Sequence, residues 1–178
     1  MRKSIIAILM TFCLSIMTYA QTPRDRATEL KEQAQSSLNQ KDYIKARYLF
    51  KKAYEAFATR ENYPQAIECG VQANALYVRE NFYKEGFELC RDMDQLIWTG
   101  EQNQKKVFYD LRFLVNKERL QMYTALKNPA QAKTQLNKLE ETANLAKNDS
   151  LTEVLLYTKA NYYYTFNQNT QGDACFRK

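Results

Sequence analysis

The sequence predicts an all-α fold made of antiparallel helical hairpins that repeat along the chain. The first indication is composition, because 178 residues contain only four Gly and three Pro, while good helix formers such as Ala, Leu, Lys, Glu and Gln are abundant. The second is a short phrase that recurs four times, and the third is a helical spacing of apolar residues between its copies. We therefore expect an α-solenoid of three full hairpins and a fourth that is truncated at Lys178.

The first twenty residues have the features of an export signal. Arg2 and Lys3 give a positively charged start, an apolar run covers 4–17, and Thr18 and Ala20 are small residues at the two positions that a signal peptidase recognises. A membrane anchor is the alternative, but the apolar run is shorter than the ~20 residues that a spanning helix needs. We therefore predict that residues 1–20 are a signal peptide and that the mature chain is periplasmic.

The remaining segment, 21–178, is long enough for one domain with its own core. The whole chain has 26 Lys and Arg against 20 Asp and Glu, a formal net charge of +6. These charges alternate along the sequence instead of forming the concentrated basic stripe of a nucleic-acid-binding protein. We therefore expect no nucleic-acid partner, and membrane contact only if a further segment follows the chain.

Three cysteines lie outside the predicted signal peptide: Cys69, Cys90 and Cys175. An odd number does not make a disulfide framework, and each lies on an apolar helical face, which favours small buried hydrophobes. A Cys69–Cys90 disulfide is the alternative, since these residues fall on consecutive antiparallel helices of a protein expected in an oxidising compartment. Their spacing matches no metal site.

The recurring phrase is a polar turn followed by a small residue that begins a helix. The small residues are Ala46, Gly86, Ala132 and Ala174, which stand 40, 46 and 42 residues apart. In the first three copies, apolar residues follow four and seven positions later, so all three side chains share one face of a helix. A small side chain there lets two antiparallel helices approach closely beside the turn.

Helix boundaries follow from this phrase and from polar or helix-breaking residues between apolar stretches. We take Asn62 with Pro64, Trp98-Thr99-Gly100, and Asn148-Asp149-Ser150 as helix edges. The predicted helices lie near 24–39, 42–59, 64–79, 83–98, 102–127, 129–147 and 150–167, with a further turn opening at 171.

The first copy of the phrase is similar to the signature of the tetratricopeptide repeat (TPR) family. Its matching residues, within about 27–60, are Leu30, Ala34, Tyr43, Ala46, Phe50 and Ala53. The second copy keeps Tyr77, Tyr83 and Gly86, and the third keeps Tyr123 and Ala132 but exceeds the family's usual length. Signal peptide and repeats together also resemble the exported N-terminal repeat region of bacterial TPR-containing regulators and sensor proteins.

The resemblance implies that the first helix of each hairpin lines a concave binding face. Polar and basic side chains on that face suit an extended peptide or an acidic tail. Of three consecutive tyrosines at 162–164 we place Tyr163 on the groove side, because consecutive helical residues cannot all face the core. The expected binding residues are Lys31, Gln35, Gln72, Arg79, Lys117, Gln121, Lys159 and Tyr163.

A clamp for a C-terminal carboxylate, which some TPR domains have, is not expected. Lys31 fits such a clamp, but Gln35 and Gln72 stand where asparagines would be needed. Leu114 and Glu118 occupy positions where basic residues would complete it.

Catalytic equipment is missing from the sequence. The chain contains no histidine, and it has no nucleophile elbow, phosphate-binding glycine loop or zinc-spaced cysteines. We expect neither a metal nor another cofactor. The predicted function is a non-catalytic protein- or peptide-binding scaffold in the periplasm. The alternative is the periplasmic sensory domain of a longer membrane-spanning signalling protein, either a histidine kinase or a transcriptional regulator.

Overall fold

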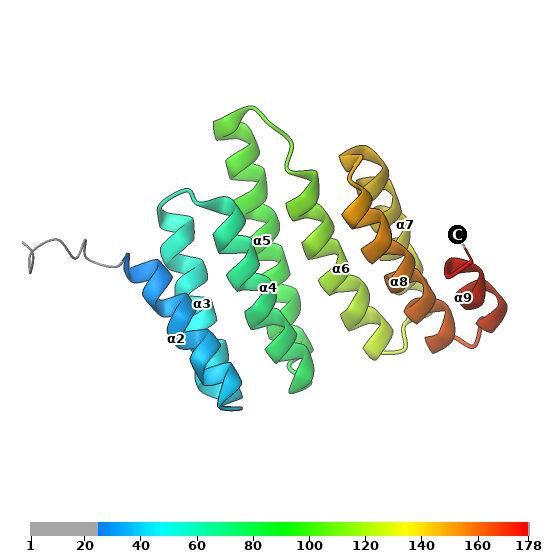
Figure 1. Cartoon of the computed structure of the whole chain (residues 1–178), viewed down its shortest axis with the longest axis horizontal. Helices are drawn as coiled ribbons and strands as arrows, with labels where there is room; N and C mark the ends of the chain where they lie inside the picture. Colours follow the sequence, from blue (N-terminus) through cyan, green and yellow to red (C-terminus); the bar gives the residue numbers. More distant parts are fainter. Residues whose placement is uncertain (1–24, 178) are drawn as a thin grey trace, which may run out of the picture.

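The computed structural model describes residues 25–177, so the predicted signal peptide lies outside the described residues. Within that range the chain forms eight α-helices and no strand, which confirms the all-α prediction (Figure 1). The helices are α2 (Arg26–Asn39), α3 (Tyr43–Thr59), α4 (Tyr63–Arg79), α5 (Tyr83–Gln104), α6 (Tyr109–Ala125), α7 (Pro129–Ala146), α8 (Asp149–Thr165) and α9 (Asn169–Cys175).

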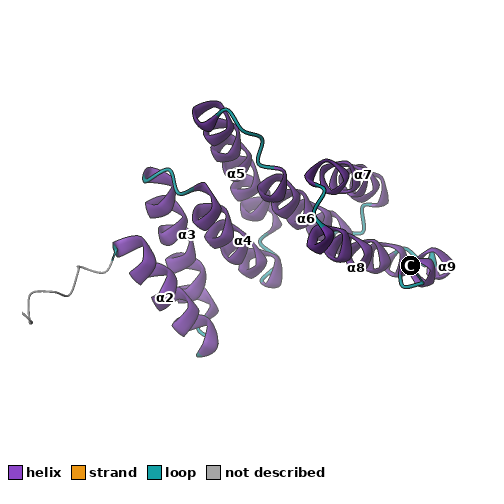
Figure 2. Ribbon diagram, turned by 45° about the horizontal axis from the view of Figure 1, so that its top comes forward, coloured by secondary structure: helices purple, strands orange, loops and turns teal. Residues whose placement is uncertain are grey.

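The helices pack in two layers. Each helix packs against the next one along the chain, and in addition α4 contacts α6 and α6 contacts α8. Figures 1 and 2 show α2, α4, α6 and α8 following one another across the molecule, with α3, α5 and α7 beside them in the second layer. We call the outward surface of α2, α4, α6 and α8 the even face, and that of α3, α5, α7 and α9 the odd face.

The tight turns between helices share one backbone geometry. The residue before the next helix's N-cap has a positive φ in every tight turn, between 50° and 63°. In most of these turns the N-cap N–H then donates to the carbonyl five residues earlier, as Asp42 does to Ser37 at 2.9 Å. This left-handed ending satisfies the last carbonyls of one helix while reversing the chain.

A single spacing of twenty residues underlies the repeat. Seven helices begin at N-caps twenty residues apart, with one exception: the interval across α5 is six residues longer. The repeating unit is therefore one helix with its turn, and two units make a 40-residue hairpin. These N-caps are Asp42, Asn62, Phe82, Phe108, Asn128, Asn148 and Gln168.

The predicted helix edge at Trp98-Thr99-Gly100 is wrong, and so is the predicted single helix 102–127. Helix α5 continues to Gln104, and the chain breaks between that residue and Tyr109. Gly100 lies inside the helix, where a Cβ would come within 2.9 Å of the rings of Phe108 and Tyr63. This glycine therefore serves a close approach between helices, not a helix end.

The fourth copy of the phrase also lies in a different register from the predicted one. A buried small residue occurs four positions after the N-cap in α3, α4, α5, α7 and α9. In α9 this residue is Gly172, against which the Tyr164 ring packs, whereas Ala174 is exposed. The small residue at this contact is therefore two positions earlier than expected.

Helix α6 divides the apolar interior into two clusters. Its Leu111, Val115 and Met122 belong to a cluster formed with α2 to α5. Its Phe113 and Leu120 belong to a second cluster formed with α7 and α8. Helix α6 therefore joins the two clusters. The stability of each helix depends mainly on the helices that pack directly against it.

The three described cysteines are free and buried, as expected for small apolar residues, and no Cys69–Cys90 disulfide is formed. Burial raises the pKa of Cys69 to about 11 and that of Cys90 to about 12. Both therefore remain thiols at neutral pH and are poor nucleophiles.

Candidate functional site

All eight expected binding residues lie on the even-numbered helices, two on each. Because the four helices stand side by side, the residues are spread along the layer and do not converge on one point (Figure 1). Whether they form a surface therefore depends on the contacts that each side chain already makes.

On α2 and α4, most of these side chains are occupied by partners within the protein. The Lys31 ammonium lies 2.8 Å from both Gln65 Oε1 and Glu68 Oε1 of α4. The Arg79 guanidinium stacks on the Tyr43 ring, 3.7 Å from its centroid, and Gln35 donates to the side chain of Asn39 at 3.1 Å.

The fourth residue of this half, Gln72, is exposed. The contacts of Lys31 and Arg79 tie neighbouring helices of this half together, whereas that of Gln35 lies within α2. They leave few free polar groups for a ligand.

On α8, Lys159 and Tyr163 lie on the side that packs toward α7. Lys159 forms an ion pair with Glu140 of α7, and Tyr163 is half-buried with its ring 5.3 Å from that of Tyr162 in an edge-on contact. Residues four apart share a helix face, and neither residue lines the space between α6 and α8. Tyr162, and not the expected Tyr163, faces α6.

Lys117 and Gln121 of α6 lie in a groove between α6 and α8, which we call the even-face groove. Its volume is about 380 Å³. One wall carries the two predicted residues together with Lys127, at the turn that follows α6. The opposite wall is formed by Val154, Tyr157, Asn161 and Tyr162 of α8.

This groove combines apolar surface with positive charge that is only partly compensated, because Lys117 Nζ lies 3.8 Å from Oε1 of the buried Glu118. No acidic side chain lines it, whereas Lys117 and Lys127 do. Tyr157 is 62% exposed, and Thr124 Oγ1 is buried with no hydrogen-bond partner among the described residues. A ligand that supplies an acceptor or donor to this hydroxyl would relieve a desolvated polar group.

A buried polar pair holds α4 against α6 beside this groove. Asn74 Nδ2 donates to Glu118 Oε2 at 3.0 Å, and both side chains are almost fully buried. Burial raises the pKa of Glu118, while the Asn74 hydrogen bond and the charge of Lys117 oppose that change. Glu118 is therefore an internal packing residue of α6 and is not available to a ligand.

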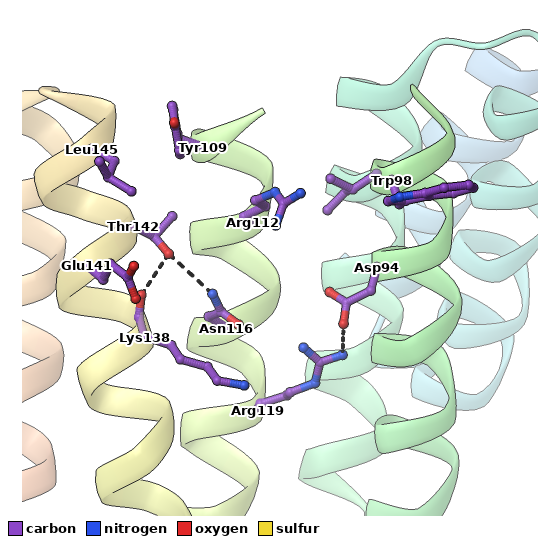
Figure 3. Close-up of a pocket in the computed structure, with 11 residues that line it drawn as sticks. Asp94, Trp98, Tyr109, Arg112, Asn116, Arg119, Lys138, Glu141, Thr142 and Leu145 are labelled. Carbon is purple, nitrogen blue, oxygen red and sulfur yellow. Dashed lines mark hydrogen bonds and ion pairs between the residues drawn. The ribbon is translucent and has the colours of Figure 1, made fainter. Parts of the chain in front are cut away.

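A second groove, on the odd face, runs between α5 and α7 across α6 (Figure 3). Its volume is about 470 Å³, and Trp98 and Leu145 stand on opposite sides of it. Sequence reasoning missed this groove. An exposed tryptophan is the one signal that pointed to it, but Trp98 was assigned to a helix edge.

The two arginines of this odd-face groove are held by fixed partners. Arg112 donates from Nε to Glu101 Oε1 at 2.7 Å and forms an ion pair with the same carboxylate. Arg119 donates to the Cys90 carbonyl at 2.9 Å and pairs with Asp94. The hydrogen bonds from Arg112 hold the pKa of Glu101 below its usual value, although burial opposes this. These pairs brace α5 against α6.

Within residues 25–177, no group of three or more His, Cys, Asp or Glu side chains is placed to hold a metal ion. None of the described helices combines the length and the apolar character needed to cross a bilayer. Comparison with protein-family models, curated proteins and solved structures finds no match. The similarity to TPR proteins therefore rests on the residues of the first copy and stays a prediction.

Proposed function

We propose that this protein is a non-catalytic scaffold that binds an extended acidic segment of a partner protein in its even-face groove. The observation that carries the proposal is the charge of this groove: Lys117 and Lys127 line it, and none of its lining residues is acidic. The one carboxylate paired with Lys117 is that of the buried Glu118, 3.8 Å away. Acidic segments are attracted to such a surface and are held there by charge-assisted hydrogen bonds.

The remaining lining residues suit a peptide backbone. The side-chain amides of Gln121 and Asn161 both donate and accept hydrogen bonds, so they match the N–H and C=O groups of an extended chain. Tyr157 and Val154 add exposed apolar surface that a side chain of the peptide covers. This combination favours a peptide with acidic residues next to an apolar or aromatic one.

Its place of action, in this proposal, is the periplasm, because residues 1–20 have the features of an export signal. The alternative, a periplasmic sensory domain of a longer signalling protein, adds an output domain to the same scaffold. Both versions use the same groove, so a single binding test applies to both.

The test is selection of displayed random peptides on the wild-type protein, followed by calorimetric titration of the enriched sequences. We expect acid-rich sequences, and we expect Lys117→Glu to weaken their binding at least about tenfold, since a charge pair becomes a repulsion. Lys133→Glu is the matched control, because it makes the same charge change at an exposed position of α7 outside the groove. Neutral or basic selected peptides, or equal loss of binding in both variants, would contradict the proposal.

A further inference from the structure

The outward surface of α3 carries a stripe of lysines around two exposed apolar side chains. Ile44 is 69% exposed and Tyr48 is 61% exposed, the two highest values among the large hydrophobic residues of this helix and its turns. Their spacing of four residues places them on one side of the helix. We call this set the α3 stripe: Lys41, Ile44, Lys45, Tyr48, Lys51 and Lys52.

The apolar residues of the α3 stripe are not required for the core. The opposite side of α3 already supplies a full set of buried side chains, among them Phe50, Ala53 and Phe57. Ile44 and Tyr48 are therefore exposed in addition to a complete amphipathic face. Exposed apolar side chains rimmed by charge are typical of an interaction surface.

The positive charge of the stripe is largely uncompensated. Among the described residues, no acidic side chain pairs with Lys41, Lys45 or Lys51. Lys52 is paired with Glu55 at 2.8 Å. Asp42, at the start of the helix, accepts a hydrogen bond from the Lys45 N–H as its N-cap.

The edge of the stripe is held in place by a stacked arginine. The Arg47 guanidinium lies over the rings of Tyr77 and Phe82, at 4.8 Å and 5.0 Å from their centroids, and pairs with Glu80. A recess of about 390 Å³ beside these groups is lined by residues of the stripe, including Lys51 and Lys52. Glu55 also lines the recess and is paired with Lys52, so Lys51 is the lysine of the recess that is open to a phosphate group.

We propose that the α3 stripe is a peripheral binding surface for anionic lipid bilayers. In this arrangement the lysines lie among the lipid phosphates, and Ile44 and Tyr48 enter the boundary between headgroups and acyl chains. A bilayer is favoured over a nucleic acid because Ile44, the most exposed apolar residue of the stripe, gains nothing from a sugar-phosphate backbone. A bilayer is favoured over an acidic protein because Ile44 and Tyr48 both project outward from the helix. The fluid interface of a bilayer can cover two projecting side chains without a preformed pocket.

The experiment is co-sedimentation with vesicles of phosphatidylcholine alone or of phosphatidylcholine mixed with phosphatidylglycerol. The chain used starts at Gln21, because the apolar run at 4–17 would itself partition into vesicles. We expect binding only to the anionic vesicles, and weaker binding as salt concentration rises.

Variants separate the contributions to this binding. Lys51→Glu/Lys52→Glu should reduce binding at least about tenfold, since each lysine near an anionic surface contributes roughly 1 kcal/mol, a factor of about five. Ile44→Ser/Tyr48→Ser should reduce it without removing the salt dependence. Lys133→Glu/Lys138→Glu, the matched charge control on exposed positions of α7, should bind almost as the wild type does.

Several results would overturn the proposal. They are equal binding to neutral and anionic vesicles, no binding to either, and an equal loss in the α3 and α7 double variants. Binding of duplex DNA that is lost in Lys51→Glu/Lys52→Glu, without vesicle binding, would assign the stripe to nucleic acid instead. Circular dichroism of each variant, showing unchanged helix content, ensures that a loss reports on the surface.

Discussion

Glu118 is a carboxyl group in an apolar interior with one hydrogen bond from Asn74. Asn74 Oδ1 has no partner among the described residues, so a single hydrogen bond joins the pair. Burial raises the pKa of Glu118 above its ordinary value, which means that the folded state holds this proton more tightly than the unfolded state does. The Cys90 thiol, whose pKa this carboxylate also raises, and Lys117 are the other titratable groups that interact with it.

This raised pKa predicts a pH dependence of stability. The stabilising contribution of Glu118 is complete below the ordinary carboxyl pKa and is lost as pH rises through the higher folded value. We therefore expect the free energy of unfolding of Glu118→Gln to increase relative to that of the wild type as the pH rises above the ordinary carboxyl pKa. Urea titrations at several pH values measure this difference.

Glu101 has a lowered pKa and the opposite pH dependence, but it is present in both proteins and cancels in the comparison. An amide at position 118 also offers a donor to the unpartnered Asn74 oxygen, so the variant should fold. If the difference in unfolding free energy between the two proteins did not change with pH, the pKa of Glu118 would be the same in the folded and unfolded states. That result would contradict the prediction.

Two glycines give a matched prediction about close packing. An added Cβ at Gly100 meets two aromatic rings, whereas at Gly70 its nearest neighbour is the flexible Met93 Sδ at 2.6 Å. We expect Gly100→Ala to lower the free energy of unfolding by about 1–3 kcal/mol. Gly70→Ala should cost less, because Met93 can move and alanine favours the helix by about 1 kcal/mol. Thermal melts of both variants would reveal the opposite order if the rings around Gly100 were loosely packed.

At the scale of elements, Glu101 stabilises the connection between α5 and α6, where the repeat is six residues longer than elsewhere. Its carboxylate accepts the Phe108 N–H at 2.9 Å and also binds Arg112 of α6. One acidic residue thus fixes both the α5–α6 connection and the contact between these helices.

Glu101→Ala should therefore destabilise the protein by about 1–3 kcal/mol, since the partly buried backbone N–H of Phe108 loses its acceptor. Most of this loss belongs to the Phe108 contact, because the Arg112 side chain is 46% exposed and its ion pair is screened by water. Arg112→Ala is the comparison variant and should be milder in urea unfolding. A larger effect for Arg112→Ala would mean that the ion pair, not the connection, dominates.

The sequence allowed the helical units to be predicted where their N-caps are Asp or Asn. Asp42, Asn62 and Asn128 each accept a backbone N–H in the first turn of a helix, and the predicted boundaries nearby are right to within a few residues. Phe108 makes no side-chain cap, and the start of α6 after it was not predicted. Phe82 makes none either, but the helix that follows it was predicted from residue 83, where α5 begins. Residues 101–106 are polar helix formers, and propensity alone therefore placed no break between α5 and α6.

The candidate site was predicted only in part, for a different physical reason. Helical periodicity identifies which helix a residue belongs to, and all eight expected residues lie on the intended helices. It does not reveal which side chains find partners on the next helix, as Lys31 does with Glu68 and Lys159 with Glu140. Only Lys117 and Gln121 therefore lie in the even-face groove.

At the scale of the whole molecule, two clusters meeting at α6 imply unequal local stability. A substitution in the second cluster should loosen α7 and α8 before it affects α3 and α4, because contacts in a repeat array are between neighbours. Leu139→Ala, at a fully buried position, should cost about 2–5 kcal/mol. Hydrogen exchange should then lose protection first in α7 and α8. Equal loss in all helices would show instead that the chain unfolds as one unit.

At this scale, we assign peptide binding to the even-face groove and not to the odd-face groove. The even-face groove is lined by two lysines and by no acidic residue, whereas the arginines of the odd-face groove are paired with Glu101 and Asp94 (Figure 3). The most direct measurement is NMR mapping of backbone amide shifts during titration with an acid-rich peptide from the displayed selection. We predict shifts concentrated in residues 117–127 and 154–165. Shifts centred on Trp98, Tyr109 and Leu145, or no saturable shifts at all, would contradict the assignment.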